Sequence, residues 1–181
     1  MSIVSSLTTR QIATLSTTAI RALSTTQIGS VSATQIAALS ATNVSVLDST
    51  QMAVLNATQI KGLTTSQLAS LTTTDIGELA DTQVGALTTT QLTALSATNI
   101  SALDATQTAA LSTTQIKGLT ATQVKGLSET DFGDLSGTQI AALTSSQLGA
   151  LTTTVIGALT TTQVGSLQTT QITGLSTTQI D

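Results

Sequence analysis

The sequence predicts an all-α solenoid of very short helices, one for every eight residues. Three observations predict it. Leucine recurs at every eighth position from Leu7 to Leu175, with Val31 as the one replacement; a second apolar residue follows five positions later; and a helix-capping residue directly follows each leucine, with two exceptions. A fixed period of this kind is typical of repeat proteins, in which each unit contacts mainly its neighbours.

The chain is organised as a short lead-in, residues 1–6, followed by one continuous array, residues 7–181. The array contains 22 units, called octads below. The first 21 have eight residues each without insertion or deletion, and the last covers residues 175–181. Slots are numbered from the leucine, so the residues from Leu23 to Ser30 occupy slots 1 to 8.

Slots 1 and 6 are the expected core. Slot 6 is apolar in every octad except at Thr108, and no charged residue enters either slot. Eight residues of continuous α-helix turn through about 800°, which would rotate an apolar stripe by about 80° per octad. A continuous strand fails as well, because odd spacings place slots 1 and 6 on opposite faces. The chain therefore has to turn within every octad.

Slots 2 and 5 indicate where each helix begins. Slot 2 is Ser, Thr, Asp or Asn except at Ala80 and Gln168, which is the residue set preferred at a helix N-cap. Slot 5 is Gln, Asn or Asp except at Ala19 and Val155, so the pair resembles a capping box. We expect a helix over slots 3 to 8 of each octad, first at 9–14, next at 17–22, and so on along the array. Helices this short need neighbours for stability.

A β-solenoid with two octads in each coil of about 16 residues is the alternative architecture. It is favoured by slot 4, which is Thr or Ser in every octad except at Arg10, because stacked threonines suit strands and capping does not require them. The Asp and Asn residues of slots 2 and 5, with the many Gly and Ala residues of slots 7 and 8, favour helices instead.

Slots 3, 7 and 8 are expected to face the surface. Lys117 and Lys125 occupy slot 7 of successive octads, where like charges would repel each other if they were buried. Glycine and alanine in slots 7 and 8 would let backbones approach closely.

The composition removes most catalytic chemistry. The chain has no Cys or His, its net charge is −4, and it has five Lys and Arg residues in all. We therefore expect no enzyme, no catalytic residue, no cofactor and no small-molecule substrate. Without a basic patch or aromatic platforms we expect no nucleic-acid binding. Polar residues interrupt every apolar stretch, so no membrane span is expected, and the N-terminus does not resemble a classical signal peptide.

The acidic residues form two loose groups, and neither predicts a metal site. They are Asp75, Glu78 and Asp81 in one group and Glu129, Asp131 and Asp134 in the other. Several carboxylates could bind a cation such as Ca²⁺, but their spacing fits no known calcium loop. We interpret them as solvated charges that keep a nearly neutral chain soluble.

Runs such as LTTTQLTALSATNI (87–100) and LTTTQVGSLQTTQI (159–172) resemble the LTTxQIxA octapeptide arrays of large bacterial surface-associated or secreted proteins. The resemblance covers the chain beyond Ser6. It implies an extracellular or cell-surface location and an adhesin-like or filament-forming role, and it transfers no functional residue.

The sequence thus predicts a structural repeat protein that forms an elongated fibre or stalk and associates with itself, laterally or end to end. The alternative is a binding module whose Thr-rich face recognises a repetitive ligand, either ice or a polysaccharide. Threonines such as Thr88, Thr89 and Thr90 would supply that face.

Overall fold

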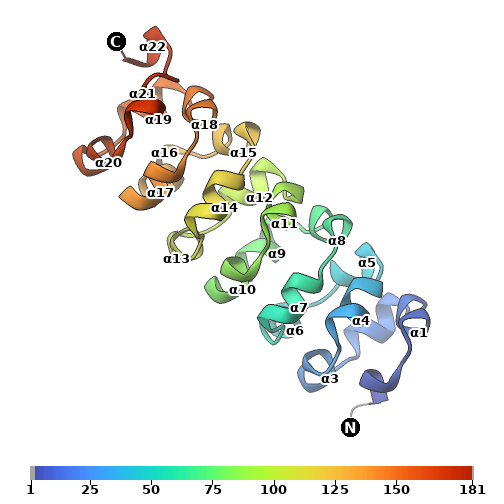
Figure 1. Ribbon diagram of the computed structural model, residues 1–181. Helices are drawn as coiled ribbons and strands as arrows, with labels where there is room; N and C mark the ends of the chain where they lie inside the picture. Colours follow the sequence, from blue (N-terminus) through green and yellow to red (C-terminus); the bar gives the residue numbers. More distant parts are fainter. Residues whose placement is uncertain (1–2, 181) are drawn as a thin grey trace. The chain divides into compact units, whose positions relative to one another are not determined.

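The computed structural model describes residues 3–180 and divides into two compact units, unit 1 (residues 1–95) and unit 2 (residues 96–181), each described here by itself. Within the described residues every regular element is a short helix, and Figure 1 shows these helices joined by extended linkers. Unit 1 contains η1 (Ile3–Ser6), α1 (Thr9–Ala13), α2 (Thr17–Arg21), α3 (Thr25–Gly29), α4 (Ala33–Ala38), α5 (Ala41–Val44), α6 (Ser49–Ala53), α7 (Ala57–Gly62), α8 (Thr65–Ala69), α9 (Thr73–Gly77), α10 (Asp81–Ala86) and α11 (Thr89–Ala94). Unit 2 contains α12 (Ala97–Ser101), α13 (Ala105–Ala109), α14 (Thr113–Gly118), α15 (Ala121–Lys125), α16 (Glu129–Gly133), α17 (Gly137–Ala142), α18 (Ser145–Gly149), α19 (Thr153–Gly157), α20 (Thr161–Ser166), α21 (Thr169–Ile172) and α22 (Thr177–Ile180).

Each octad folds as the sequence predicts, with helix α4 as an example. Ser32 has an extended backbone, and its hydroxyl accepts the N–H of Gln35 while the Gln35 side chain accepts the N–H of Ser32. The N–H of Ile36 donates to the carbonyl of Ser32, and the N–H of Leu39 donates to that of Ile36. The second bond spans only three residues, which tightens the last turn before the next cap begins. The helix therefore ends after six residues.

Each coil of the solenoid contains between three and four octads. In unit 1 helix α4 contacts α1 and α7, and in unit 2 α17 contacts α14 and α20. Hydrogen bonds between coils join residues 28 and 31 positions apart, such as Gln67 to the carbonyls of Leu39 and Ile36. One coil thus takes about 28 residues, or three and a half octads.

The core follows slots 1 and 6, as predicted. Slot 6 residues from Ile12 to Leu148 are at most 7% exposed, and Thr108 is the most exposed of them. Slot 1 residues are buried from Val31 to Leu119 and at Leu135, Leu143 and Leu151. They are half-buried at Leu7, Leu15, Leu23, Leu127, Leu159, Leu167 and Leu175. The interior of each unit therefore consists mainly of Leu, Ile and Val side chains.

Two sequence expectations need correction. The β-solenoid alternative is wrong, because residues 3–180 form helices with no strand among them and a coil takes more than two octads. The surface assignment of slot 8 is wrong in many octads, where this residue is half-buried against the preceding coil, as at Gly62 and Ala86. The exposure of slot 7 is confirmed at Lys117 and Lys125.

Candidate functional site

The side-chain amide of slot 5 is the feature that joins one coil to the next. In Gln67 the Oε1 atom accepts the N–H of Thr64 at 2.7 Å and so caps its own helix. The Nε2 atom donates to the carbonyls of Ile36 at 2.8 Å and Leu39 at 2.7 Å in the preceding coil. The side chain is 1% exposed, and its burial is offset because both polar atoms are bonded.

The same arrangement recurs along both units and is called the glutamine ladder below. Its slot 5 donors and the slot 1 carbonyls that accept from them are Gln35 with Leu7, Gln51 with Leu23, Gln59 with Val31, Gln67 with Leu39, Gln83 with Leu55 and Gln91 with Leu63 in unit 1, and Gln139 with Leu111, Gln147 with Leu119, Gln163 with Leu135, Gln171 with Leu143 and Gln179 with Leu151 in unit 2. Each also donates to a carbonyl 31 residues earlier, which belongs to slot 6, as Gln91 does to Ile60, or for Gln35 to Val4 of the lead-in. Because a net hydrogen bond contributes about 1 kcal/mol, each glutamine of the ladder stabilises the contact between its own coil and the preceding one.

Residues other than glutamine in slot 5 perform only part of this role. Asn43 is one methylene shorter; it donates to Leu15 at 2.8 Å but forms no capping box with Ser40. Asp75 and Asp131 cap the backbones of Thr72 and Ser128, but a carboxylate has no hydrogen to give to a carbonyl.

The acidic groups act locally. The Asp131 carboxylate accepts the Ser101 hydroxyl at 2.6 Å, so this side chain is a capping group with an additional bond between coils. Glu78, Asp81 and Glu129 are exposed. Among residues 3–180 no three acidic side chains come close enough together to hold a metal ion.

A seam of small residues brings the backbones of successive coils together. A Cβ atom on Gly62, in slot 8, would lie 2.7 Å from the carbonyl oxygen of Ala33, in slot 3 of the preceding coil. Gly126 meets Ala97 in the same way in unit 2. No described glycine has a positive φ, so these glycines are required for space rather than for an unusual backbone conformation.

Slot 4 lies on the surface in every octad. All its residues are exposed, from Arg10 through Thr178. In some octads the threonine hydroxyl contacts the capping side chain of slot 2, as Thr50 does by donating to Asp48 at 2.6 Å and Thr106 to Asp104 at 2.8 Å. The threonines do not pack in the core, so a stacked interior ladder is not the reason for their recurrence.

These contacts also lower the pKa of the capping carboxyls Asp48 and Asp104. The Thr50 hydroxyl and then the Gln51 N–H lower the pKa of Asp48. At Asp104 the Gln107 N–H and then the Thr106 hydroxyl lower the pKa. Hydrogen bonds to a carboxylate favour its charged form, so both side chains remain anionic caps in mildly acidic solution.

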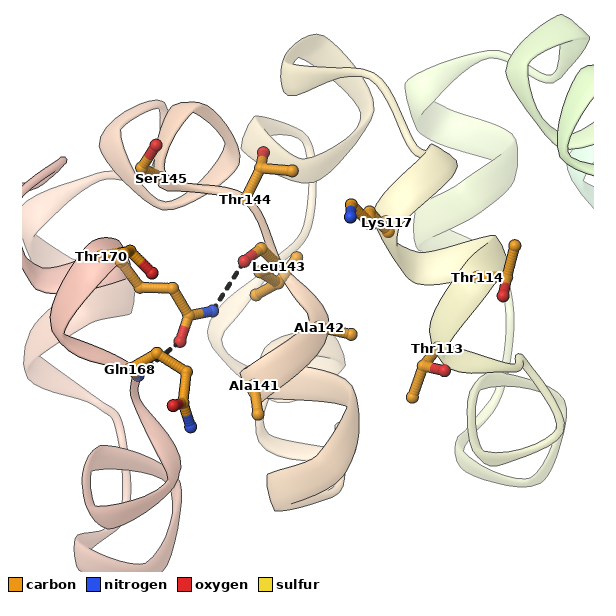
Figure 2. Close-up of a pocket in the computed structure, with 11 residues that line it drawn as sticks. Thr113, Thr114, Lys117, Ala141, Ala142, Leu143, Thr144, Ser145, Gln168 and Thr170 are labelled. Carbon is orange, nitrogen blue, oxygen red and sulfur yellow. Dashed lines mark hydrogen bonds between the residues drawn. The ribbon is translucent and has the colours of Figure 1, made fainter.

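Unit 2 contains a groove of about 560 Å³ (Figure 2). Thr113, Thr114 and Lys117 of α14 lie on one side of it, and Ala141 and Ala142 of α17 lie on the other. Residues 143–145, Gln168, Thr170 and Gln171 complete it. Its lining consists of hydroxyl, methyl and amide groups with one ammonium, which suits hydrogen bonding to a polar chain.

A second groove, of about 510 Å³, lies between α4 and α7 in unit 1. It is lined by residues 31–33 and 56–59, with no charged group among them.

The capping pattern of the sequence does not by itself predict the ladder, because a capping box accounts for slot 5 without a second partner. One signal was present: slot 5 is glutamine far more often than the equally good capping residues Glu or Asp. A capping box can contain either an amide or a carboxylate side chain at slot 5, whereas a hydrogen bond to a carbonyl requires a donor, which only the amide has. The preference for an amide was the sign of a second partner.

Fold and ladder together define an octapeptide-repeat protein of the helical solenoid class. Two stretches, residues 4–41 and 129–161, match the family model of the ALTTAQ repeat. No curated protein and no solved structure matches the chain. No helix among residues 3–180 has the length and apolar character needed to cross a bilayer.

Proposed function

We propose that this chain is a structural element that builds a fibre or stalk by self-association, outside the cell or at its surface, and that it catalyses no reaction. The glutamine ladder carries the proposal: the same bonds between coils recur in both units, as at Gln67 and Gln147, so the interface is repeated rather than unique. A repeated interface of this kind extends a structure without needing any other component. The location is supported only by the resemblance to arrays of surface-associated proteins.

Sedimentation velocity and negative-stain microscopy of the purified chain test self-association. We expect the weight-average sedimentation coefficient to rise with concentration and filaments to appear without any added ligand. A single sharp monomer boundary at high concentration would rule out the fibre.

A binding module for a repetitive polysaccharide is the second candidate, and the exposed threonine of slot 4 favours it. Hydroxyl groups recur at that position along both units, as at Thr58 and Thr162. The ice-binding form of this idea required a flat β face, which residues 3–180 do not contain. Calorimetric titration with soluble polysaccharides tests it. A heat of binding that the wild type shows, and that disappears when three neighbouring slot 4 threonines are changed to valine, would support the binding module.

A further inference from the structure

Charged side chains of opposite sign lie on opposite sides of the coil in both units. A coil takes about 28 residues, so two residues separated by half of 28 lie on opposite sides of it. Lys61 and Asp75 in unit 1 have this separation, and so do Lys117 and Asp131 in unit 2. Each lysine therefore lies across the coil from its aspartate.

The acidic residues share one side of each unit, which is called the acidic face below. The remainder that a residue number leaves on division by 28 gives the place of that residue around the coil. This remainder is between 19 and 25 for the described acidic residues of unit 1 and between 17 and 22 for those of unit 2. They are Asp48, Asp75, Glu78 and Asp81 in unit 1 and Asp104, Glu129, Asp131 and Asp134 in unit 2, and all are exposed or half-buried.

Four of the five basic residues share the other side, which is called the basic face below. The remainders are 10 for Arg10 and 5 for Lys61 in unit 1, and 5 for Lys117 and 13 for Lys125 in unit 2. All four side chains are exposed. Arg21, with a remainder of 21, is the exception and lies on the acidic side of unit 1.

Figure 1 shows the separation in unit 1. Helix α6, which is capped by Asp48, and helix α10, which begins with Asp81, lie along one side of this unit. Helix α1, which contains Arg10, lies along the other side. The two faces therefore belong to different helices and can contact different neighbours.

We propose that the acidic face of one copy docks side by side on the basic face of a second copy. Acidic residues in successive coils, such as Asp48 and Asp75, repel each other, and a basic surface laid against them offsets this repulsion. Complementary charge also fixes which surfaces meet and suppresses contact between like faces. This inference rests on the proposed function and gives the fibre its lateral contact. Because the unlike faces lie on opposite sides, each copy can bind one neighbour on each side, and the contact repeats without closing into a dimer.

Two variants of equal net charge test the contact. Lys61→Gln with Lys117→Gln removes two charges from the basic face, whereas Thr74→Glu with Thr130→Glu adds two charges to the acidic face, next to Asp75 and Asp131. Each pair of substitutions lowers the net charge from −4 by two. All four substituted side chains are exposed, so both variants should keep the helical circular dichroism of the wild type.

Sedimentation velocity measures the concentration at which half of the chains are assembled. We expect this concentration to rise about tenfold for the lysine variant and not to rise for the threonine variant. Salt gives a second measurement, because the Debye length falls to about 3 Å at about 1 M. Raising NaCl from about 0.05 M to about 1 M should therefore weaken assembly of the wild type about tenfold as well.

The outcomes separate this inference from the proposed function. Filaments that persist unchanged both in the lysine variant and in 1 M NaCl would overturn the contact between charged faces and leave the fibre intact. Equal weakening in the two variants would assign the effect to net charge rather than to its arrangement, and would also overturn the contact. A wild-type chain that stays monomeric at both salt concentrations overturns this inference and the fibre together.

Discussion

At the scale of single residues, the amide of slot 5 does two things that no other side chain of its length can do together. It accepts a backbone N–H at a helix cap and donates to two carbonyls in the neighbouring coil, as Gln67 does with Thr64, Ile36 and Leu39. Glutamate reaches equally far but cannot donate.

Replacing Gln67 by glutamate separates the two roles. The cap survives, but a carboxylate then faces two carbonyl oxygens, so we expect a loss of about 2–5 kcal/mol in the free energy of unfolding at pH 7. Burial raises the pKa of this new carboxyl above its usual value of about 4.3. The decrease in the free energy of unfolding is therefore complete at pH values above the raised pKa, and it disappears below pH ~4, where the carboxyl is protonated in both states. Denaturant unfolding across this pH range measures it. Gln11→Glu is the control, because Gln11 forms the same cap and its Nε2 atom donates to no carbonyl among residues 3–180. An equal loss there would contradict the ladder.

The pKa of Asp48 is a second prediction at this scale. Its folded value is lowered, so its contribution to stability is present at neutral pH and is lost as the pH falls through that value, below the ordinary 3.8. Thr50→Val removes the largest cause and should raise the pKa toward 3.8. A carboxyl NMR titration reports it. Thr82→Val changes slot 4 in an octad without a capping carboxylate and should leave the Asp48 titration curve unchanged.

At the scale of the helix, the close packing of slot 8 against slot 3 reverses an ordinary rule. Glycine to alanine in a helix usually stabilises by up to about 1 kcal/mol. At Gly62 the added methyl group would overlap Ala33, so we expect Gly62→Ala to destabilise by about 1–3 kcal/mol.

Gly77 gives the matched comparison, because it also ends a helix and nothing lies within 4 Å of the Cβ position. Gly77→Ala should be neutral or stabilising by up to about 1 kcal/mol. Thermal unfolding of the two variants side by side measures the contrast. If both variants changed the unfolding temperature in the same direction, the approach of the backbones at Gly62 would not be tight.

The helices themselves could be predicted from sequence because their signals are local. The cap at Ser32, its partner Gln35 and the core residue Ile36 all lie within five residues of each other. The number of octads in a coil could not be predicted this way, since an eight-residue period is compatible with any coil length. The donor role of slot 5 and the burial of slot 8 both depend on coil length, so they were missed. Slot 4 favoured the incorrect β-solenoid alternative because threonine favours strands in general. Here its threonines lie outside the core, beside the caps.

At the scale of the whole molecule, stability should depend on the number of intact octads rather than on any one of them. Deleting residues 63–70 removes one octad and joins slot 8 to slot 1, so every cap and core position keeps its register. We expect this chain to retain its helical circular dichroism and to lose only a modest part of its unfolding free energy.

Deleting residues 65–68 removes half as many residues but joins slot 2 to slot 7. One helix and its ladder bond are lost, and we expect a larger drop in the denaturant midpoint than for the octad deletion. Equal effects of the two deletions would argue against register as the source of stability.

Because a coil contains about three and a half octads, repeats are added in register most simply in blocks of two coils. Each helix lies across the boundary between two octads of the coil before it, so seven octads form the smallest block that spans a whole number of coils. Four of the rarer residues of the chain recur at that interval: Asn43, Asp48, Lys61 and Asp75 return as Asn99, Asp104, Lys117 and Asp131. A duplicated block of two coils joins to its parent with every octad meeting its neighbours at the original half-octad offset. The interval at which these residues recur is therefore seven times longer than the octad that folds as one helix.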